Sequence, residues 1–144
     1  VAYQEWGTAC MNAAKMLSPV TITQQVQKDS NNSLQIEATI RNLSYDLLKL
    51  KYIAWLTEDS IIGPQKMPNN KINTEYLHNH ILRDAITSTW GQSIELEASD
   101  FTTVSLNYPL PAKVVPKNCN IVGIVLKDNE AIQVNEYKLK NIIK

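Results

Sequence analysis

The chain has 144 residues and a formal net charge of zero, with 14 basic and 14 acidic side chains. This length fits about one domain, which can bury roughly two-thirds of the surface of its unfolded chain without disulfides or metals. The balanced charge supplies no basic field, so nucleic acid is excluded as an expected partner, and no apolar run approaches the ~20 residues that a membrane-spanning helix needs.

The first predicted element is a short amphipathic helix between Gln4 and Leu17. Its apolar residues recur at spacings of four, three and four: Trp6, Cys10, Ala13 and Leu17. Ser18-Pro19 ends the helix, because the residue before a proline is pushed out of the α region. We therefore expect residues 1–18 to form an N-terminal helix, which either packs on the following domain or closes an upstream one, and residues 19–144 to form a separate β domain.

From Pro19 onward the apolar residues alternate with polar ones, as in strands with one wet face. We expect strands at about 20–27, 34–41, 48–56, 81–86, 93–98, 102–108, 120–126 and 132–139, separated by turns such as 28–32, 99–100 and 128–129. Eight short strands with frequent turns predict an all-β fold. The predicted architecture is an immunoglobulin-like two-sheet β-sandwich with Greek-key connections, preceded by the short α-helix.

The predicted strand over 48–56 is the longest. Its even positions, from Leu48 to Leu56, are apolar and predict a face turned to the core, whereas its odd positions place two lysines beside an isoleucine and Trp55. The odd face is therefore either half covered by a neighbour or exposes an aromatic side chain to a partner. Trp90, in a predicted turn, is a second candidate contact residue, and for both tryptophans burial between the sheets is the alternative.

Two acidic residues, Glu58 and Asp59, end this strand. They are candidates for an acid/base pair or a calcium-binding corner, but neighbouring carboxylates seldom converge on one substrate and the spaced ligands of a calcium loop are absent. Turn formation is the favoured role, with Asp59 and Ser60 bonding backbone groups. The stretch 60–75 is rich in Pro, Asn and Lys, and we predict a long loop that is functional or mobile.

The two histidines, His78 and His80, would point to the same side of an extended segment. A metal site would need further ligands, for which Glu75 and Asp84 are nearest in sequence and Glu58 and Asp59 are candidates across the fold. We favour imidazoles that hydrogen-bond loop backbone and predict no metal. No nucleophile elbow and no glycine-rich phosphate loop is recognisable, so we expect no enzyme activity and no cofactor.

The two cysteines, Cys10 and Cys119, are too far apart in sequence for a redox or zinc motif. A bridge between them would close a loop of more than a hundred residues, with about 4 to 5 kcal/mol of stabilisation in the chain-entropy model. A free buried cysteine is the favoured alternative.

Several motifs resemble the C-terminal β domain of the twenty-eight-kilodalton outer-membrane protein family of Bacteroidetes. They are WLTEDSIIGPQ at 55–65, YLHNHILR at 76–83 with Trp90-Gly91 after it, and NIVGIVLKD and AIQVNEYKL between 120 and 139. The likeness spans about residues 19–144. It implies a secreted lipoprotein at the outer membrane or cell surface, with the periplasmic face as an alternative, anchored by a lipidated cysteine upstream of this chain. Members often carry a thioredoxin-like region before this domain.

The resemblance transfers no catalytic residue, so the predicted function is non-catalytic binding of a protein or glycan partner at the cell surface. The predicted binding residues are Trp55, Glu58, Asp59, His78, His80 and Trp90. The alternative is a structural spacer that positions an upstream thioredoxin-like domain. At the level of the phylum, Asp59-Ser60-Ile61 fits a short Asp-Ser/Thr-apolar pattern of O-glycosylation, which makes Ser60 a predicted glycan site.

Overall fold

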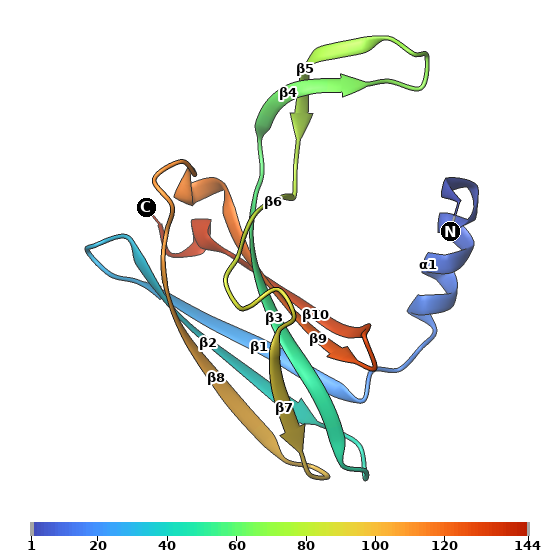
Figure 1. Cartoon of the computed structure of the whole chain (residues 1–144), viewed down its shortest axis with the longest axis vertical. Coiled ribbons are helices and arrows are strands. Elements are labelled where there is room, and N and C mark those ends of the chain that lie inside the picture. The colour runs from blue at the N-terminus through green and yellow to red at the C-terminus, as the bar shows by residue number, and fades with distance from the viewer. Residues whose placement is uncertain (1, 144) are drawn as a thin grey trace.

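The computed structural model describes residues 2–143, in which two antiparallel sheets stack face to face and a hairpin and a helix project from them (Figure 1). The helical elements are η1 (Tyr3–Glu5), α1 (Trp6–Ala14), η2 (Pro116–Asn118) and η3 (Leu139–Asn141). The strands are β1 (Val20–Lys28), β2 (Ser33–Asn42), β3 (Leu48–Glu58), β4 (Ile61–Lys66), β5 (Ile72–His78), β6 (Ile81–Ala85), β7 (Gln92–Leu96), β8 (Phe101–Pro109), β9 (Cys119–Lys127) and β10 (Glu130–Lys138). The predicted sandwich with a short N-terminal helix is confirmed.

The first sheet has the order β1-β2-β8, and the second has the order β10-β9-β3 with both β6 and β7 on the remaining side of β3. β7 pairs with β3 from Leu48 to Tyr52, and β6 pairs with it from Trp55 to Glu58. β4 and β5 pair only with each other. β3 is therefore the centre of the second sheet and continues directly into the projecting hairpin.

The predicted alternation places the core between the two sheets. Every even-numbered residue of β3 from Leu48 to Leu56 is buried, as are Leu34, Ile36 and Ile40 of β2. On the odd-numbered face of β3, Lys49 is exposed and Lys51 and Trp55 are half-buried, but Ile53 is also buried. The outer face of the second sheet is thus partly covered, which is one of the two arrangements expected for it.

One buried polar residue, Gln24, interrupts the apolar inner face of β1. Its Nε2 donates to the carbonyl oxygens of Ile121 and Asn135 at 3.2 and 3.0 Å, and its Oε1 accepts from the Tyr52 hydroxyl at 3.2 Å. A Cβ on Gly123 would lie 2.8 Å from Gln24 Oε1, so only glycine leaves room for the amide. These bonds join β1 to β9 and β10 and close one side of the sandwich.

The N-terminal helix is shorter than predicted, and of the two arrangements expected for it, it does not adopt packing on the following domain. α1 ends at Ala14 rather than at Leu17, and none of its residues is buried. In Figure 1 it stands beside the sandwich and not on it. A nine-residue helix is stabilised mainly by packing of an apolar face, and the two sheets do not provide that packing here. No helix in the described residues is long and apolar enough to cross a membrane.

The predicted long loop over 60–75 is wrong, because residues 61–78 form the β4–β5 hairpin. The Asn-rich stretch makes only its tip: Met67 N–H donates to Lys71 O at 2.8 Å, and Asn70 has a φ of 63°. A register shift between Gly63 and Gln65 accommodates Pro64 in β4. We call residues 61–78 the arm.

Candidate functional site

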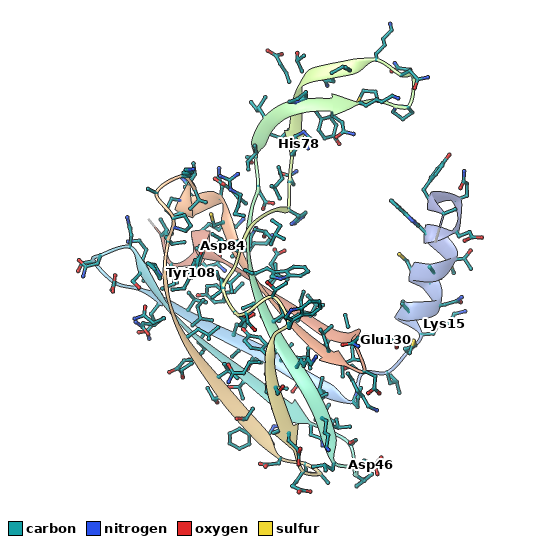
Figure 2. The ribbon with its side chains drawn as sticks, in the orientation of Figure 1. Lys15, Asp46, His78, Asp84, Tyr108 and Glu130 are labelled. Atoms are coloured by element: carbon teal, nitrogen blue, oxygen red, sulfur yellow. The ribbon has the colours of Figure 1, made fainter. Side chains whose placement is uncertain are left out.

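The arm is the most prominent exposed feature of the molecule, extending beyond the end of the sandwich at the top of Figure 1. Its apolar side chains face solvent: Ile62 is 67 % exposed, Ile72 68 %, Leu77 50 % and Tyr76 38 %. Ile62 lies directly opposite Leu77, so the two form a cross-strand apolar pair on one face. Tyr76 and His78, two residues apart, meet on the other face with ring centroids 5.0 Å apart. Figure 2 labels His78 on the arm. Both faces of the arm therefore present side chains that a partner can contact.

The root of the arm is fixed by hydrogen bonds between its two chain segments. Asp59 Oδ1 accepts from the His80 backbone N–H at 2.7 Å, and the Ser60 N–H donates to Asn79 Oδ1 at 3.0 Å. Ser60 and His80 both adopt left-handed backbone conformations, with φ of 64° and 57°. The chain thus turns sharply at both ends of the arm, and this geometry rather than a packed core sets its direction.

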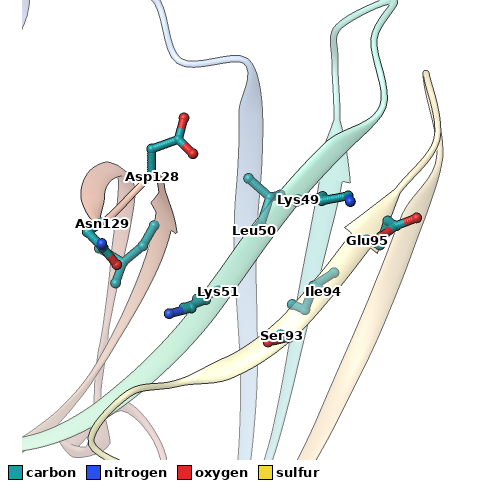
Figure 3. A pocket seen from close by; sticks show the side chains of 9 residues that line it. Lys49, Leu50, Lys51, Ser93, Ile94, Glu95, Asp128 and Asn129 are labelled. Carbon is teal, nitrogen blue, oxygen red and sulfur yellow. The ribbon is translucent and has the colours of Figure 1, made fainter.

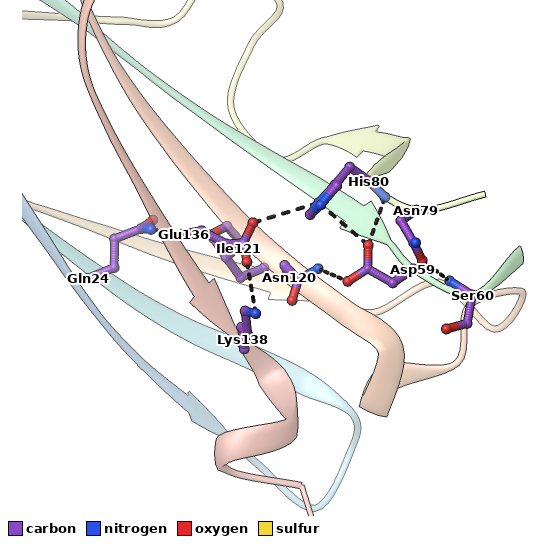
Figure 4. Close-up of polar contacts among 9 residues, drawn as sticks. All are labelled: Gln24, Asp59, Ser60, Asn79, His80, Asn120, Ile121, Glu136 and Lys138. Atoms are coloured by element: carbon purple, nitrogen blue, oxygen red, sulfur yellow. Dashed lines mark hydrogen bonds and ion pairs between the residues drawn. The ribbon is translucent and has the colours of Figure 1, made fainter. Parts of the chain in front are cut away.

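A network of charged groups connects this root to the second sheet (Figure 4). Asp59 Oδ2 accepts from Asn120 Nδ2 at 2.9 Å. His80 Nδ1 lies 3.5 Å from Asp59 Oδ1 and 3.8 Å from Glu136 Oε2, and Lys138 Nζ lies 3.8 Å from Glu136 Oε1. Side chains from β9 and β10 therefore hold the turn from which the arm begins.

Glu58, the last residue of β3, is buried and paired. Its Oε2 lies 3.1 Å from Arg83 Nε of β6, and its Oε1 accepts from the Val115 N–H at 2.7 Å. The Glu58 side chain is 4 % exposed and that of Arg83 30 %. Because both carboxylate oxygens have partners, Glu58 ties the end of β3 to β6 and to the segment before η2, a structural task rather than a catalytic one.

At this end of the sandwich, the surroundings lower the pKa of Asp59 and raise the pKa of Cys119. Burial alone would raise the pKa of Asp59, but the hydrogen bonds from His80 and Asn120 and the nearby charges of His80 and Lys138 outweigh it and lower that pKa. Burial, followed by the charge of Glu58, raises the pKa of the Cys119 thiol to about 11. Asp59 is therefore held as a carboxylate and Cys119 as a neutral thiol.

The predicted site residues do not form one cluster. Trp55 is half-buried on the outer face of the second sheet, opposite Ala85 and Val122, whereas Trp90 is 80 % exposed on the turn between β6 and β7. His78 lies in the arm and His80 at its root, where the positive φ breaks the extended conformation that would have aligned the two imidazoles. Within residues 2–143 no group of three or more His, Cys, Asp and Glu side chains is placed to hold a metal ion.

The cysteines are not bridged in this structure: Cys10 is free and exposed on α1, and Cys119 is free and buried in the core. The helix that carries Cys10 stands away from the sheets (Figure 1). Ser60, the predicted glycan site, is exposed at the root of the arm. Its modification stays a prediction.

Sequence reasoning missed the partners of the predicted carboxylates. Arg83 of β6 contacts Glu58, Asn120 of β9 contacts Asp59, and Glu136 of β10 contacts His80. Lys138 of β10 contacts Glu136 in turn. The signal that could have found them is the pairing between strands. Asn120 lies opposite Thr57, and Lys138 lies opposite Asn120, so all three share the outer face of the second sheet. Recognising this shared face requires the correct order of the strands in the sheet.

The family model described as outer membrane protein Omp28 matches residues 1–142. This chain belongs to the Omp28 family. The family description names a location, the outer membrane, and no reaction, and membership places the chain in the extracytoplasmic cell envelope as a domain of an outer membrane lipoprotein family. No curated protein has a matching sequence.

Two of the solved structures that share the fold come from Porphyromonas gingivalis. HBP35 of Porphyromonas gingivalis superimposes with a TM-score of 0.73 at 14 % identity, covering 94 % of this chain and 46 % of HBP35. A domain of the outer membrane lipoprotein Omp28 from Porphyromonas gingivalis superimposes with a TM-score of 0.55 at 18 % identity, covering 85 % of this chain and 89 % of that domain. The chain thus spans about half the length of HBP35 and most of the Omp28 domain.

Proposed function

We propose that this Omp28-family chain is a non-catalytic binding domain of the cell envelope that holds a protein partner through the arm. The observation that carries the proposal is the exposure of apolar side chains on a hairpin without a core of its own. A two-stranded hairpin is marginally stable at best in water. Covering Ile62, Ile72 and Leu77 would contribute roughly 1–2 kcal/mol for each side chain, given that about half to two-thirds of each is exposed.

The edges of the arm are less suited to binding than its faces. Pro64 has no N–H to offer to an added strand, and the Glu75 N–H already donates to Asn73 Oδ1 at 3.0 Å. Gln65 Nε2 donates to the Lys66 carbonyl oxygen at 3.0 Å, which occupies a further edge group. The proposed partner therefore contacts side chains of the arm and does not extend its sheet.

Site-specific cross-linking tests this proposal. A photoreactive side chain at position 77 of the arm should give a discrete cross-linked product with one partner protein in intact cells. Adding Ile62→Ser to that variant should abolish the product. Leu43→Ser is the matched control, since Leu43 is 54 % exposed in the turn before β3, at the opposite end of that strand. The proposal fails when position 77 gives no discrete product, or when the product survives Ile62→Ser.

A second candidate function is a spacer that positions an upstream thioredoxin-like domain. The observation that favours this role is the exposure of the apolar side chains of α1. Trp6 is 61 % and Met11 66 % exposed, and no residue of the helix is buried. In such a protein the apolar side chains of α1 would be covered by the preceding domain. Amide hydrogen exchange over residues 6–14 decides this role: strong protection in the longer protein and little in the isolated chain support it, and equally fast exchange in both refutes it.

A further inference from the structure

A polar hollow of about 470 Å³ lies on the second sheet, at the end of β3 opposite the arm (Figure 3). It exists because β9 stops short of the start of β3: the pairing between them begins only at Lys51, opposite Leu126. Asp128 and Asn129 then turn the chain into β10, both with positive φ as a two-residue hairpin turn requires. Because no strand in the described part of the chain pairs with Lys49 and Leu50 on the β9 side, the hollow remains open there. Its volume is in the range typical of small-molecule sites, ~300–1,000 Å³.

The side chains around the hollow come from three strands and one turn. Lys51 lies opposite Ser93 and Lys49 lies opposite Glu95, so these four point to the outer face, while Leu50 and Ile94 are buried beneath them. The turn between β9 and β10 supplies the remaining wall. The strand register and the conformation of this turn therefore fix the positions of these side chains.

Six polar side chains line the hollow: Lys49, Lys51, Ser93, Glu95, Asp128 and Asn129. Across residues 2–143, none of the six makes a side-chain hydrogen bond or ion pair. Two ammonium groups, two carboxylates, a hydroxyl and an amide therefore line the hollow without being bonded to one another. The formal charges cancel, so the site has no net charge to attract an anion or a cation, and its mixture of donors and acceptors matches a neutral ligand with many hydroxyl groups.

Trp90 stands three residues before Ser93, at most about 10 Å along an extended chain. Its turn is fixed: the Gly91 N–H donates to Ser88 O at 2.9 Å, and Ser88 Oγ donates to Gly91 O at 3.0 Å. Gly91 has a φ of 80°, and a Cβ there would lie 2.9 Å from the Tyr52 carbonyl oxygen, so the turn is pressed against β3. An indole that is 80 % exposed on such a backbone offers a flat apolar surface at little entropic cost.

We propose that the hollow and Trp90 together form a binding site for a neutral oligosaccharide. The hydroxyl groups of a sugar unit exchange hydrogen bonds with the lysines, Asp128 and Asn129, while the apolar face of a neighbouring unit lies on the indole. This site is separate from the arm and goes beyond the proposed protein binding. The protein-binding proposal and the sugar-binding proposal can each be tested independently.

Two-dimensional amide NMR with the whole chain and four neutral trisaccharides (cellotriose, maltotriose, mannotriose and N,N′,N″-triacetylchitotriose) tests the proposal. At least one should shift the Trp90 indole N–H and the Ser93 and Asn129 amides with a dissociation constant of about 1 mM or tighter. Trp90→Ala and Lys51→Met should each weaken that binding about tenfold or more. Both positions are outside the core, so the fold is retained and the amide spectrum verifies it.

The matched controls are Leu43→Ser and the arm variant Ile62→Ser, which should leave sugar binding unchanged. The proposal is overturned when none of the four sugars shifts these resonances at millimolar concentrations, or when both Trp90→Ala and Lys51→Met bind as the unaltered chain does. Binding of trigalacturonate with the same shifts, and of no neutral sugar, would overturn the assignment to a neutral ligand.

Discussion

Replacing Glu58 by Gln is the sharpest test of how the end of β3 is held. The substitution keeps the shape of the side chain and one acceptor for the Val115 N–H, but it turns an amide donor or a neutral oxygen toward Arg83 in place of a carboxylate. Breaking a buried ion pair costs about 3–5 kcal/mol. Because the Arg83 side chain is 30 % exposed and can recover some hydration, we expect a loss of about 2–4 kcal/mol in the free energy of unfolding.

Urea denaturation followed by fluorescence measures this loss, and a melting temperature lower by roughly 5–15 °C should accompany it. Glu95→Gln is the matched control: Glu95 is exposed, so its loss should change stability by less than about 0.5 kcal/mol. A double-mutant cycle with Arg83→Met should give a coupling of about 1–3 kcal/mol. A cost below about 1 kcal/mol for Glu58→Gln would show that the pair contributes little and that this reasoning is wrong.

Three further outcomes are expected. Gly91→Ala should destabilise the chain by about 2–3 kcal/mol in the same urea assay, since the new Cβ meets the Tyr52 carbonyl oxygen at 2.9 Å in a left-handed backbone; a neutral result would mean that the turn moves freely. A thiol reagent should label Cys10 at once and Cys119 only on unfolding, because Cys119 is buried with a pKa of about 11; two fast thiols in native protein would contradict this. The folded-state pKa of Asp59 is lowered, so its contribution to stability is present above the unfolded value and is lost as the pH falls below about 4; Asp59→Asn should flatten that part of the stability profile, and an unchanged profile would count against the network at the root of the arm.

Alternation was sufficient to predict the sandwich, because burial between two sheets requires an apolar residue at every second position. β2 and the inner face of β3 follow that rule without exception from Leu34 to Ile40 and from Leu48 to Leu56. The arm escaped prediction for the opposite reason. It packs on no core, so its strands carry no sustained apolar period, and Pro64 with the Asn-rich tip is typical of a loop.

The contacts at the root of the arm were only half predictable. That Asp59 would bond backbone at the strand end followed from turn chemistry, and it does accept from the His80 N–H. Its second partner, Asn120, lies 61 residues further along the chain and reaches it through the pairing of β3 with β9. Gln24 was missed similarly, since the need for a buried amide arises only where β1 meets β10 across the sandwich.

The arm leaves and rejoins the sandwich through two short segments, and the hydrogen bonds at this junction use mainly the side chains of Asp59, Asn79 and Asn120. None of the residues beyond the junction, from 61 to 78, belongs to the hydrophobic core. Substitutions there remove no side chain from the core, so they should cost the sandwich less stability than substitutions in β2 or β3. The same scaffold can therefore carry an arm of altered length or composition while the sandwich stays as it is.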